Sequence, residues 1–214
     1  IIATNINRTA QKHLHFQKEH TIMPNWAFTS YVVTGEKKEV CDLYEKMKSL
    51  EERDGSLVKN AFGRTWLGNL VTLLGGSWEK VFCRGWWSNL RKDCDDGALR
   101  FDTESAWAEL KDVRQFLQSK YPSLNIYFQS EEPGMAIYET NDGDGEYFPE
   151  RIKVDHREDG DEYFETWEEV YEHVTGITGV CVSSYGELCA ATKAYNKEHP
   201  ENCIYFNEFK TVEE

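Results

Sequence analysis

The sequence predicts an α+β protein in which two amphipathic helices cover one face of a mainly antiparallel sheet. Three observations lead to this prediction. Short runs rich in aromatic and β-branched residues alternate with segments of helical periodicity. Glycine and proline separate these runs at turn positions. The chain of 214 residues, 40% hydrophobic and 14% aromatic, is also long enough to bury a core of its own.

The first predicted strand and helix follow each other directly. Residues 26–34 read WAFTSYVVT, and this run of aromatic and β-branched residues ends at Gly35, which predicts a strand. Residues 36–52, EKKEVCDLYEKMKSLEE, then place apolar residues at helical spacing, with lysines and glutamates between them. Residues 54–78 contain five glycines around the apolar piece LVTLL, so we interpret them as an insertion that holds one short helix.

The middle of the chain predicts a hairpin, a second helix and three more strands. We interpret residues 79–87 and 97–104 as two strands that pair around a polar connection. Apolar residues then recur at three and four residues from Trp107 and predict a helix over 106–120. The segments SLNIYFQS, MAIYET and ERIKVDHR follow as strands, and the last of them, 150–157, has the cleanest alternation in the chain.

Laid end to end, these elements predict a ferredoxin-like antiparallel sheet with helices on one face and extra strands. Two more helices are predicted to start at Thr166 and Ser184, each with a glutamate three residues later as in a capping box, and a strand over 203–209 follows. The pattern leaves open which sheet this last strand joins. We therefore expect an N-terminal extension (1–22), a ferredoxin-like domain (23–157) and a C-terminal α+β extension packed on it (158–214).

Four motifs occur in a fixed order along the first two thirds of the chain: MPNWAFTSYVVTGEKKEV, GWWSNLRKD, LRFDTESAW and YPSLNIYFQSEEPGM. Together they resemble the YubB-type ferredoxin-like family, which is encoded on plasmids, phages and other mobile elements. The resemblance covers about residues 23–155 and implies the ferredoxin-like fold, with Met23 at the usual start. It implies no catalytic residue. The chain departs from the family pattern at two places: GWWSN stands where an Asn-Trp-Gly segment is expected, and residues 103–107 lack the usual following prolines.

The net charge of −14 is concentrated in one segment. Residues 131–172 carry 3 lysines and arginines against 16 aspartates and glutamates, whereas residues 1–130 carry 18 against 16. Binding to nucleic acid needs a basic face that releases counterions from phosphates, and no such cluster is present. We therefore expect no direct nucleic-acid binding. The acidic segment instead suggests a surface for a protein partner.

Several kinds of site lack their sequence signatures. No apolar run has the length of a membrane span and no signal layout is present, so we expect no membrane association and a cytoplasmic protein. Phosphate loops, dinucleotide motifs, zinc-protease motifs and serine-hydrolase elbows are absent. The turn at 141–146 places Arg151 where a calcium loop needs glutamate, and His13, His15 and His20 have no further ligand at zinc spacing. We expect no metal and no cofactor.

The six scattered cysteines and one histidine have structural explanations. The cysteines form no C-x-x-C pair, so we expect reduced thiols that pack as small hydrophobes. A thiolate–imidazole pair of Cys83 or Cys94 with His156 is conceivable, but nothing in the sequence brings them together. His156 lies on the apolar side of its predicted strand, which favours a hydrogen-bonded core histidine.

Candidate site residues gather around the predicted hairpin and the strand after the second helix. Adjacent Trp86 and Trp87 must face opposite sides of a strand, which allows one of them to be partly exposed for a protein partner or a stacked ligand. The favoured interpretation is that the tryptophans belong to the core and are covered by the helices. Adjacent Glu131 and Glu132 also face opposite sides, so only one of them can line a cleft with Asp102 or Glu104. The full candidate surface consists of Arg84, Trp86, Trp87, Asp102, Trp107, Glu131 and Glu132.

These observations favour a non-enzymatic module of a mobile element that binds a protein through its aromatic region or its acidic segment. The first alternative is a hydrolase-like enzyme for small molecules, with a cleft lined by Trp87, Asp102 and Glu131. It requires these side chains to converge around a concave pocket. The second alternative is an acidic mimic of nucleic acid, which requires the carboxylates of 139–162 to form one continuous surface.

Overall fold

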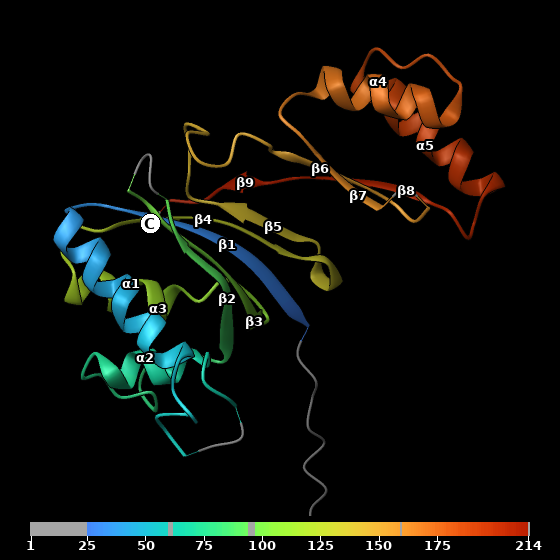
Figure 1. The fold of residues 1–214 in the computed structure, drawn as a ribbon. Coiled ribbons are helices and arrows are strands. Elements are labelled where there is room, and N and C mark those ends of the chain that lie inside the picture. Colours follow the sequence, from blue (N-terminus) through green and yellow to red (C-terminus); the bar gives the residue numbers. More distant parts are fainter. Residues whose placement is uncertain (1–24, 60–61, 94–96, 159, 214) are drawn as a thin grey trace, which may run out of the picture.

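The computed structural model describes residues 25–59, 62–93, 97–158 and 160–213 (Figure 1). The expected N-terminal extension, Met23 and the three N-terminal histidines lie outside the described residues, and so do Cys94 and Asp159. The described chain forms two units, each built from a sheet and helices that cover one of its faces. It is an α+β protein, as the sequence predicts.

A six-stranded sheet forms the first unit, with strand order β2-β3-β1-β4-β5-β9. All neighbouring strands are antiparallel except β5 and β9, which are parallel. The predicted hairpin is present, because β2 pairs directly with β3. The strands are β1 (Trp26–Thr34), β2 (Gly85–Lys92), β3 (Leu99–Ala106), β4 (Asn125–Glu132), β5 (Ile137–Thr140) and β9 (Lys210–Thr211).

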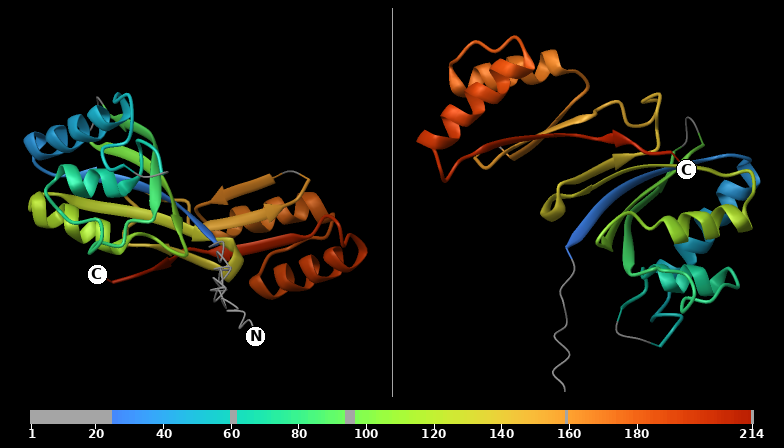
Figure 2. Two further views of the ribbon diagram at one scale, coloured as in Figure 1. Left: turned by 90° about the horizontal axis from the view of Figure 1, so that it is seen from below. Right: turned by 180° about the vertical axis from the view of Figure 1, so that it is seen from behind.

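Helices α1 (Lys37–Glu51), α2 (Leu67–Leu73) and α3 (Lys111–Lys120) cover one face of this sheet and leave the other face open on the side of the second unit (Figures 1 and 2). Val40, Leu43, Met47 and Leu50 of α1 recur at helical spacing and are buried in the core between the helices and the sheet. Gly35 ends β1 with φ 145°, and a Cβ there would lie 2.5 Å from the backbone oxygen of Ser123, so the turn into α1 requires glycine.

The second unit is a three-stranded antiparallel sheet with two helices. The strands β6 (Ile152–His156), β7 (Gly160–Phe164) and β8 (Ile204–Glu208) have the order β7-β6-β8. Helices α4 (Trp167–Thr178) and α5 (Tyr185–Glu198) pack on the face that points away from the first sheet (Figure 2). Alternation along β6 sends Ile152 and Val154 into this core and turns Lys153 toward the first unit.

Both predicted helix caps in the second unit are confirmed. The Thr166 hydroxyl accepts a hydrogen bond from the Glu169 N–H, while the Glu169 carboxylate accepts one from the Thr166 N–H, which completes a capping box. The Ser184 hydroxyl likewise accepts from the N–H of Glu187, whereas the Glu187 carboxylate accepts from the N–H and the hydroxyl of Ser183. The first turn of a helix leaves backbone N–H groups without a partner, and each cap supplies an acceptor for them. The helix starts could be predicted because the capping residues are visible in the sequence.

Two predicted elements differ from the structure at their starts. The strand expected over 79–87 begins only at Gly85, because the preceding residues fold back on α3, where the Asp112 carboxylate accepts the N–H of Phe82. The helix expected over 106–120 begins at Lys111. Strand β3 continues to Ala106, and Trp107 has φ 75°, which a helix does not allow.

The strand predicted at 150–157 is present as β6, but it belongs to the second sheet and not to the first. The expected domain boundary at residue 157 falls between β6 and β7, which pair with each other. The segment 203–209 forms β8 in the second sheet, and the chain then returns to the first sheet as β9. Alternation identified these strands, but alternation carries no information about the partner strand.

The cysteines of the described chain differ in their exposure. Cys83 is buried as expected, whereas Cys181 and Cys189 are exposed, so the expectation that all thiols pack as small hydrophobes is wrong for these two. Both lie on the outer side of the second unit, at the start of α5 and in the loop before it. In the part of the chain that the structure describes, no helix combines the length and the apolar character needed to cross a bilayer.

Candidate functional site

The open face of the first sheet carries a row of alternating aromatic and acidic side chains. The strand register places Trp86, Glu104, Phe28, Glu131 and Tyr138 side by side across five strands. Directly opposed residues of neighbouring antiparallel strands have their Cβ atoms about 4.5–5.5 Å apart. Each glutamate of this row therefore lies between two aromatic side chains. Phe28, at the centre, is 48% exposed although it is a phenylalanine.

A cleft of about 510 Å³ lies over this row. Its floor includes Phe28, Glu104 and Glu131, together with Ser30, Asp102 and Gln129 from the next row. Its wall is formed by residues that follow β5 and by the second unit, namely Phe148, Glu150, Tyr163 and Phe209. The cleft thus lies where the two units meet, and it combines carboxylates with exposed aromatic rings.

Asp102 is held in place on the cleft floor. Its carboxylate accepts hydrogen bonds from the Ser30 hydroxyl at 2.8 Å and from the Asn89 side-chain amide at 2.7 Å. Asn89 has φ 53° and lies at a register shift between β2 and β3. Such a bulge changes the direction of the side chain, and here it lets the amide of an edge strand reach the neighbouring strand. Asp102 is therefore a fixed acceptor.

Glu131 binds a lysine of the second unit. The Lys153 ammonium lies 2.8 Å from Glu131 Oε2 and 2.7 Å from Asp161 Oδ2, and 5.5 Å from the centre of the Tyr163 ring. Burial lowers the pKa of Lys153, but the hydrogen bonds to Asp161 and Glu131 outweigh it and hold that pKa well above its usual value. Burial, followed by the charge of Glu131, raises the pKa of Tyr163 to about 12. Lys153 is therefore a cation already enclosed by carboxylates and an aromatic ring.

The wall of the cleft depends on a loop that Asp142 organises. Asp142 is 2% exposed, and its carboxylate accepts the backbone N–H groups of Glu146, Tyr147 and Phe148. Gln129 on the floor donates its side-chain amide to the backbone oxygen of Glu150. The turn at 141–146 is therefore not simply a solvated one, because the buried Asp142 carboxylate replaces solvent for three backbone donors.

The predicted site residues separate into two groups. Trp86, Asp102 and Glu131 lie on the open face, and Asp102 and Glu131 line the same cleft. The other residues lie elsewhere. Trp87 is buried among the helices, where its indole N–H donates to Glu51, and the carboxylate of buried Glu132 accepts the N–H groups of Gly134 and Met135.

Arg84 and Trp107 are exposed and are not among the residues that line the cleft. Arg84 instead lines a separate groove next to the insertion. His156, expected in a core, is buried with its Nε2 3.4 Å from the Tyr195 hydroxyl. As strand geometry predicts, Trp86 and Trp87 face opposite sides of the sheet, and so do Glu131 and Glu132.

Most of the cleft lining was not predicted from the sequence, including the aromatic residues Phe28, Phe148 and Tyr163, and neither was the contact of Lys153 with Glu131. Phe28 was accessible to pattern reasoning, because it shares a strand face with Ser30 and Trp26 in the run WAFTSYVVT. Lys153 lies on the polar side of the cleanest alternating strand, but its partner Glu131 comes from the other unit. No local pattern reveals that contact.

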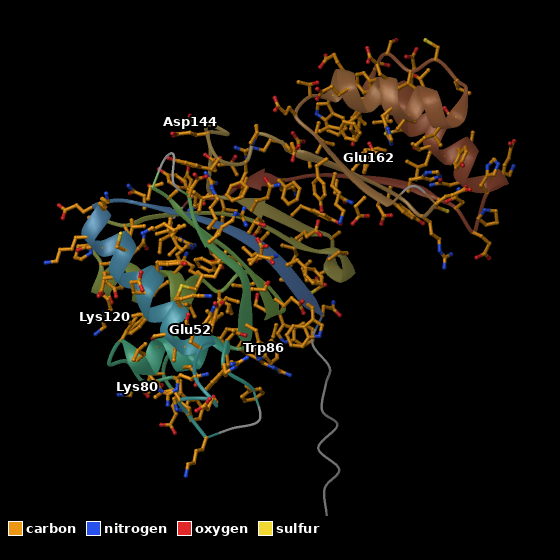
Figure 3. The ribbon with its side chains drawn as sticks, in the orientation of Figure 1. Glu52, Lys80, Trp86, Lys120, Asp144 and Glu162 are labelled. Atoms are coloured by element: carbon orange, nitrogen blue, oxygen red, sulfur yellow. The ribbon has the colours of Figure 1, made fainter. Side chains whose placement is uncertain are left out.

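The acidic segment does not form one exposed row of carboxylates. Asp142 is buried, Asp161 is bound to Lys153, and Asp144 lies on the loop after β5, apart from Glu162 on β7 (Figure 3). In the described parts of the chain, no group of three or more histidine, cysteine, aspartate or glutamate side chains has a geometry that would hold a metal ion. These positions give no support to a nucleic-acid mimic or a metal centre.

Comparison with known proteins provides no relative. No family model, no curated protein and no solved structure matches the chain. The functional argument therefore rests on the geometry of the cleft.

Proposed function

We propose that this protein is a non-enzymatic recognition module whose cleft binds a lysine- or arginine-bearing segment of a partner protein. The observation that carries the proposal is the position of Lys153, whose ammonium lies between Glu131, Asp161 and the Tyr163 ring. Glu131 and Tyr163 also line the cleft. A carboxylate between aromatic rings recurs two strands away, where Glu104 lies between Phe28 and Trp86. This second position is open to solvent.

The physical basis is the pairing of a carboxylate with aromatic faces. A carboxylate forms a charge-assisted hydrogen bond with an ammonium or guanidinium group, and the negative face of an aromatic ring attracts the same cation by about 0.5–2 kcal/mol. Gln129 on the floor is fixed by the hydrogen bond from its side-chain amide to the backbone oxygen of Glu150. Asp102 is fixed nearby by two hydrogen bonds. The floor therefore offers acceptors in a preformed arrangement, which reduces the entropy cost of binding.

The fold and family remain part of the proposal. The order β4-β1-β3-β2, with α1 before β2 and α3 after β3, supports a ferredoxin-like core extended by β5 and β9. We therefore retain the proposal of a YubB-type accessory protein of a mobile element, for which the four sequence motifs are the support. Protein binding through an open sheet face is compatible with that proposal.

The geometry supports the hydrolase alternative less well. Asp102 and Glu131 line one cleft, but they lie two strands and one row apart, which corresponds to about 12 Å between their α-carbons. Each of the two carboxylates is also occupied, Asp102 by Ser30 and Asn89 and Glu131 by Lys153. We therefore do not assign an acid/base pair.

A peptide titration tests the proposal. The probe is a fluorescent octapeptide with two lysines in a serine–glycine background, and its control carries glutamine in place of both lysines. We expect the lysine peptide to bind the full chain more tightly, and Glu104→Gln to weaken it about fivefold, the effect of losing about 1 kcal/mol. Glu52→Gln removes the same charge from an exposed residue at the end of α1, on the helix side, and is the matched control (Figure 3). Equal binding of both peptides would exclude the proposal.

A further inference from the structure

A chain of aromatic rings connects the cleft to the insertion between α1 and β2. The ring of Trp86, part of the row on the open face, has its centre 6.1 Å from that of Phe62. Phe62 lies 5.2 Å from Trp66, and Trp66 lies 5.5 Å from Trp78 in an edge-on arrangement. The rings therefore continue from the row around the edge of the sheet at β2, without a polar side chain between successive members.

The far end of this path is a groove of about 380 Å³ with exposed apolar walls. Phe62, Trp78 and Phe82 line it and are 43%, 41% and 50% exposed. Large apolar side chains that gather on a surface mark an interaction site more often than isolated ones do. Its charged lining residues are two cations, Lys80 and Arg84, and two anions, Glu79 and Asp112, so the charges balance. The groove therefore suits an apolar side chain rather than a second cation.

The groove is fixed to the sheet that carries the cleft. The Trp86 indole N–H donates to the backbone oxygen of Phe62, and the backbone N–H of Trp87 donates to that of Thr65. Trp66 forms a β-bridge with Trp86, and its indole packs so closely on Gly68 that a Cβ there would lie 2.3 Å from the ring. Because the insertion is attached to β2 at several points, the groove and the cleft keep a constant separation.

We propose that the groove is a second subsite for the same partner segment and receives a bulky apolar side chain. This inference rests on the proposed function, because the partner is placed by its cation in the cleft. Three ring-to-ring steps separate Trp86 from Trp78, and an extended chain at about 3.3 Å per residue spans them with about five residues. The partner segment then carries a lysine or arginine and, about five residues away, a leucine, methionine or aromatic residue.

Peptides of defined spacing test this inference with the full chain. The reference probe has one lysine in a serine–glycine background. Two further probes add a leucine five residues before or five residues after the lysine, and a fourth adds it two residues after. We expect one of the five-residue probes to bind about tenfold more tightly than the reference, the effect of burying most of a leucine side chain. We expect no such gain from the two-residue spacing.

Variants separate this inference from the proposed function. Phe82→Ser and Trp78→Ser are expected to abolish the tenfold gain and to leave the reference probe unchanged, whereas Glu104→Gln weakens all probes alike. Tyr205→Ser removes a 58% exposed aromatic residue from the second unit and is the matched control. Lysine-dependent binding without any gain from leucine would overturn the second subsite alone. Failure of the reference probe to bind in preference to its glutamine version would overturn both proposals.

Discussion

Replacing Lys153 by methionine tests the contact that joins the two units. Methionine keeps the unbranched shape of the side chain and removes the ammonium. The Lys153 side chain is 4% exposed and forms charge-assisted hydrogen bonds of 2.8 Å to Glu131 and 2.7 Å to Asp161. The variant leaves Glu131, which is 15% exposed, with the Tyr163 hydroxyl at 3.3 Å as its remaining hydrogen bond in the described structure.

The magnitude follows from the exposure of each partner. A hydrogen bond to a charged group contributes about 1.5–3 kcal/mol to stability. The hydrogen bond to Glu131 contributes nearly this full amount. Asp161 is 46% exposed, so solvent screens most of the contribution of the hydrogen bond to it. Removal of the ammonium also relieves its desolvation cost, which offsets part of the loss. We expect the free energy of unfolding to fall by about 2 kcal/mol.

Urea denaturation measures this change. With an m-value of about 2 kcal/mol/M, the midpoint should shift down by about 1 M. The matched control is Arg157→Gln, which breaks the ion pair with Glu201 in the same unit, where the side chains are 72% and 93% exposed. That variant should cost less than about 0.5 kcal/mol. Equal shifts for the two variants would refute the view that enclosure makes the Lys153 contact strong.

Three further predictions follow from the described contacts. Asp142→Ala should lower the free energy of unfolding by about 2–3 kcal/mol, because three backbone donors lose a buried carboxylate, and Asp142→Asn should cost less in the same urea assay. Thr166→Ala should cost about 1 kcal/mol and Thr166→Ser almost nothing, and a loss for both would argue against the cap. The free energy of unfolding should fall between pH 10 and pH 12. Tyr163 has a pKa of about 12 in the folded protein and near 10 in the unfolded chain. The stabilisation by the protonated Tyr163 is therefore complete below pH 10 and is lost as the pH rises through 12. Tyr163→Phe should show a smaller fall over that range, and a slope unchanged by this substitution would contradict the assignment.

Local patterns predicted the elements more reliably than their partners. The period of 3.6 identified α1, and the alternation of Ile152, Val154 and His156 identified β6, because each pattern reflects which side of one element is buried. The same alternation cannot say which sheet a strand joins, so β6 was placed in the wrong sheet. Trp107 extended the predicted helix because its spacing fits, although its backbone conformation ends β3.

The candidate site was predicted in part for the same reason. Opposite faces for Glu131 and Glu132 follow from the geometry of one strand, and the structure has them. The row that unites Glu104, Phe28 and Glu131 depends on the register of three strands that are distant in the sequence. The enclosure of Lys153 depends on the docking of two units. Neither property can be predicted from a short segment of the sequence.

The return of the chain to the first sheet sets an order in which the protein is completed during synthesis. Strand β9 pairs in parallel with β5 through Glu139 and Lys210, and all residues of the second unit lie between them. The ribosome therefore releases the floor of the cleft, from β1 to β5, well before Phe209 and β9. During that interval Phe28, Glu104 and Glu131 lack the part of their wall that Phe209 forms. The nascent chain thus presents its acidic and aromatic face before the cleft is complete.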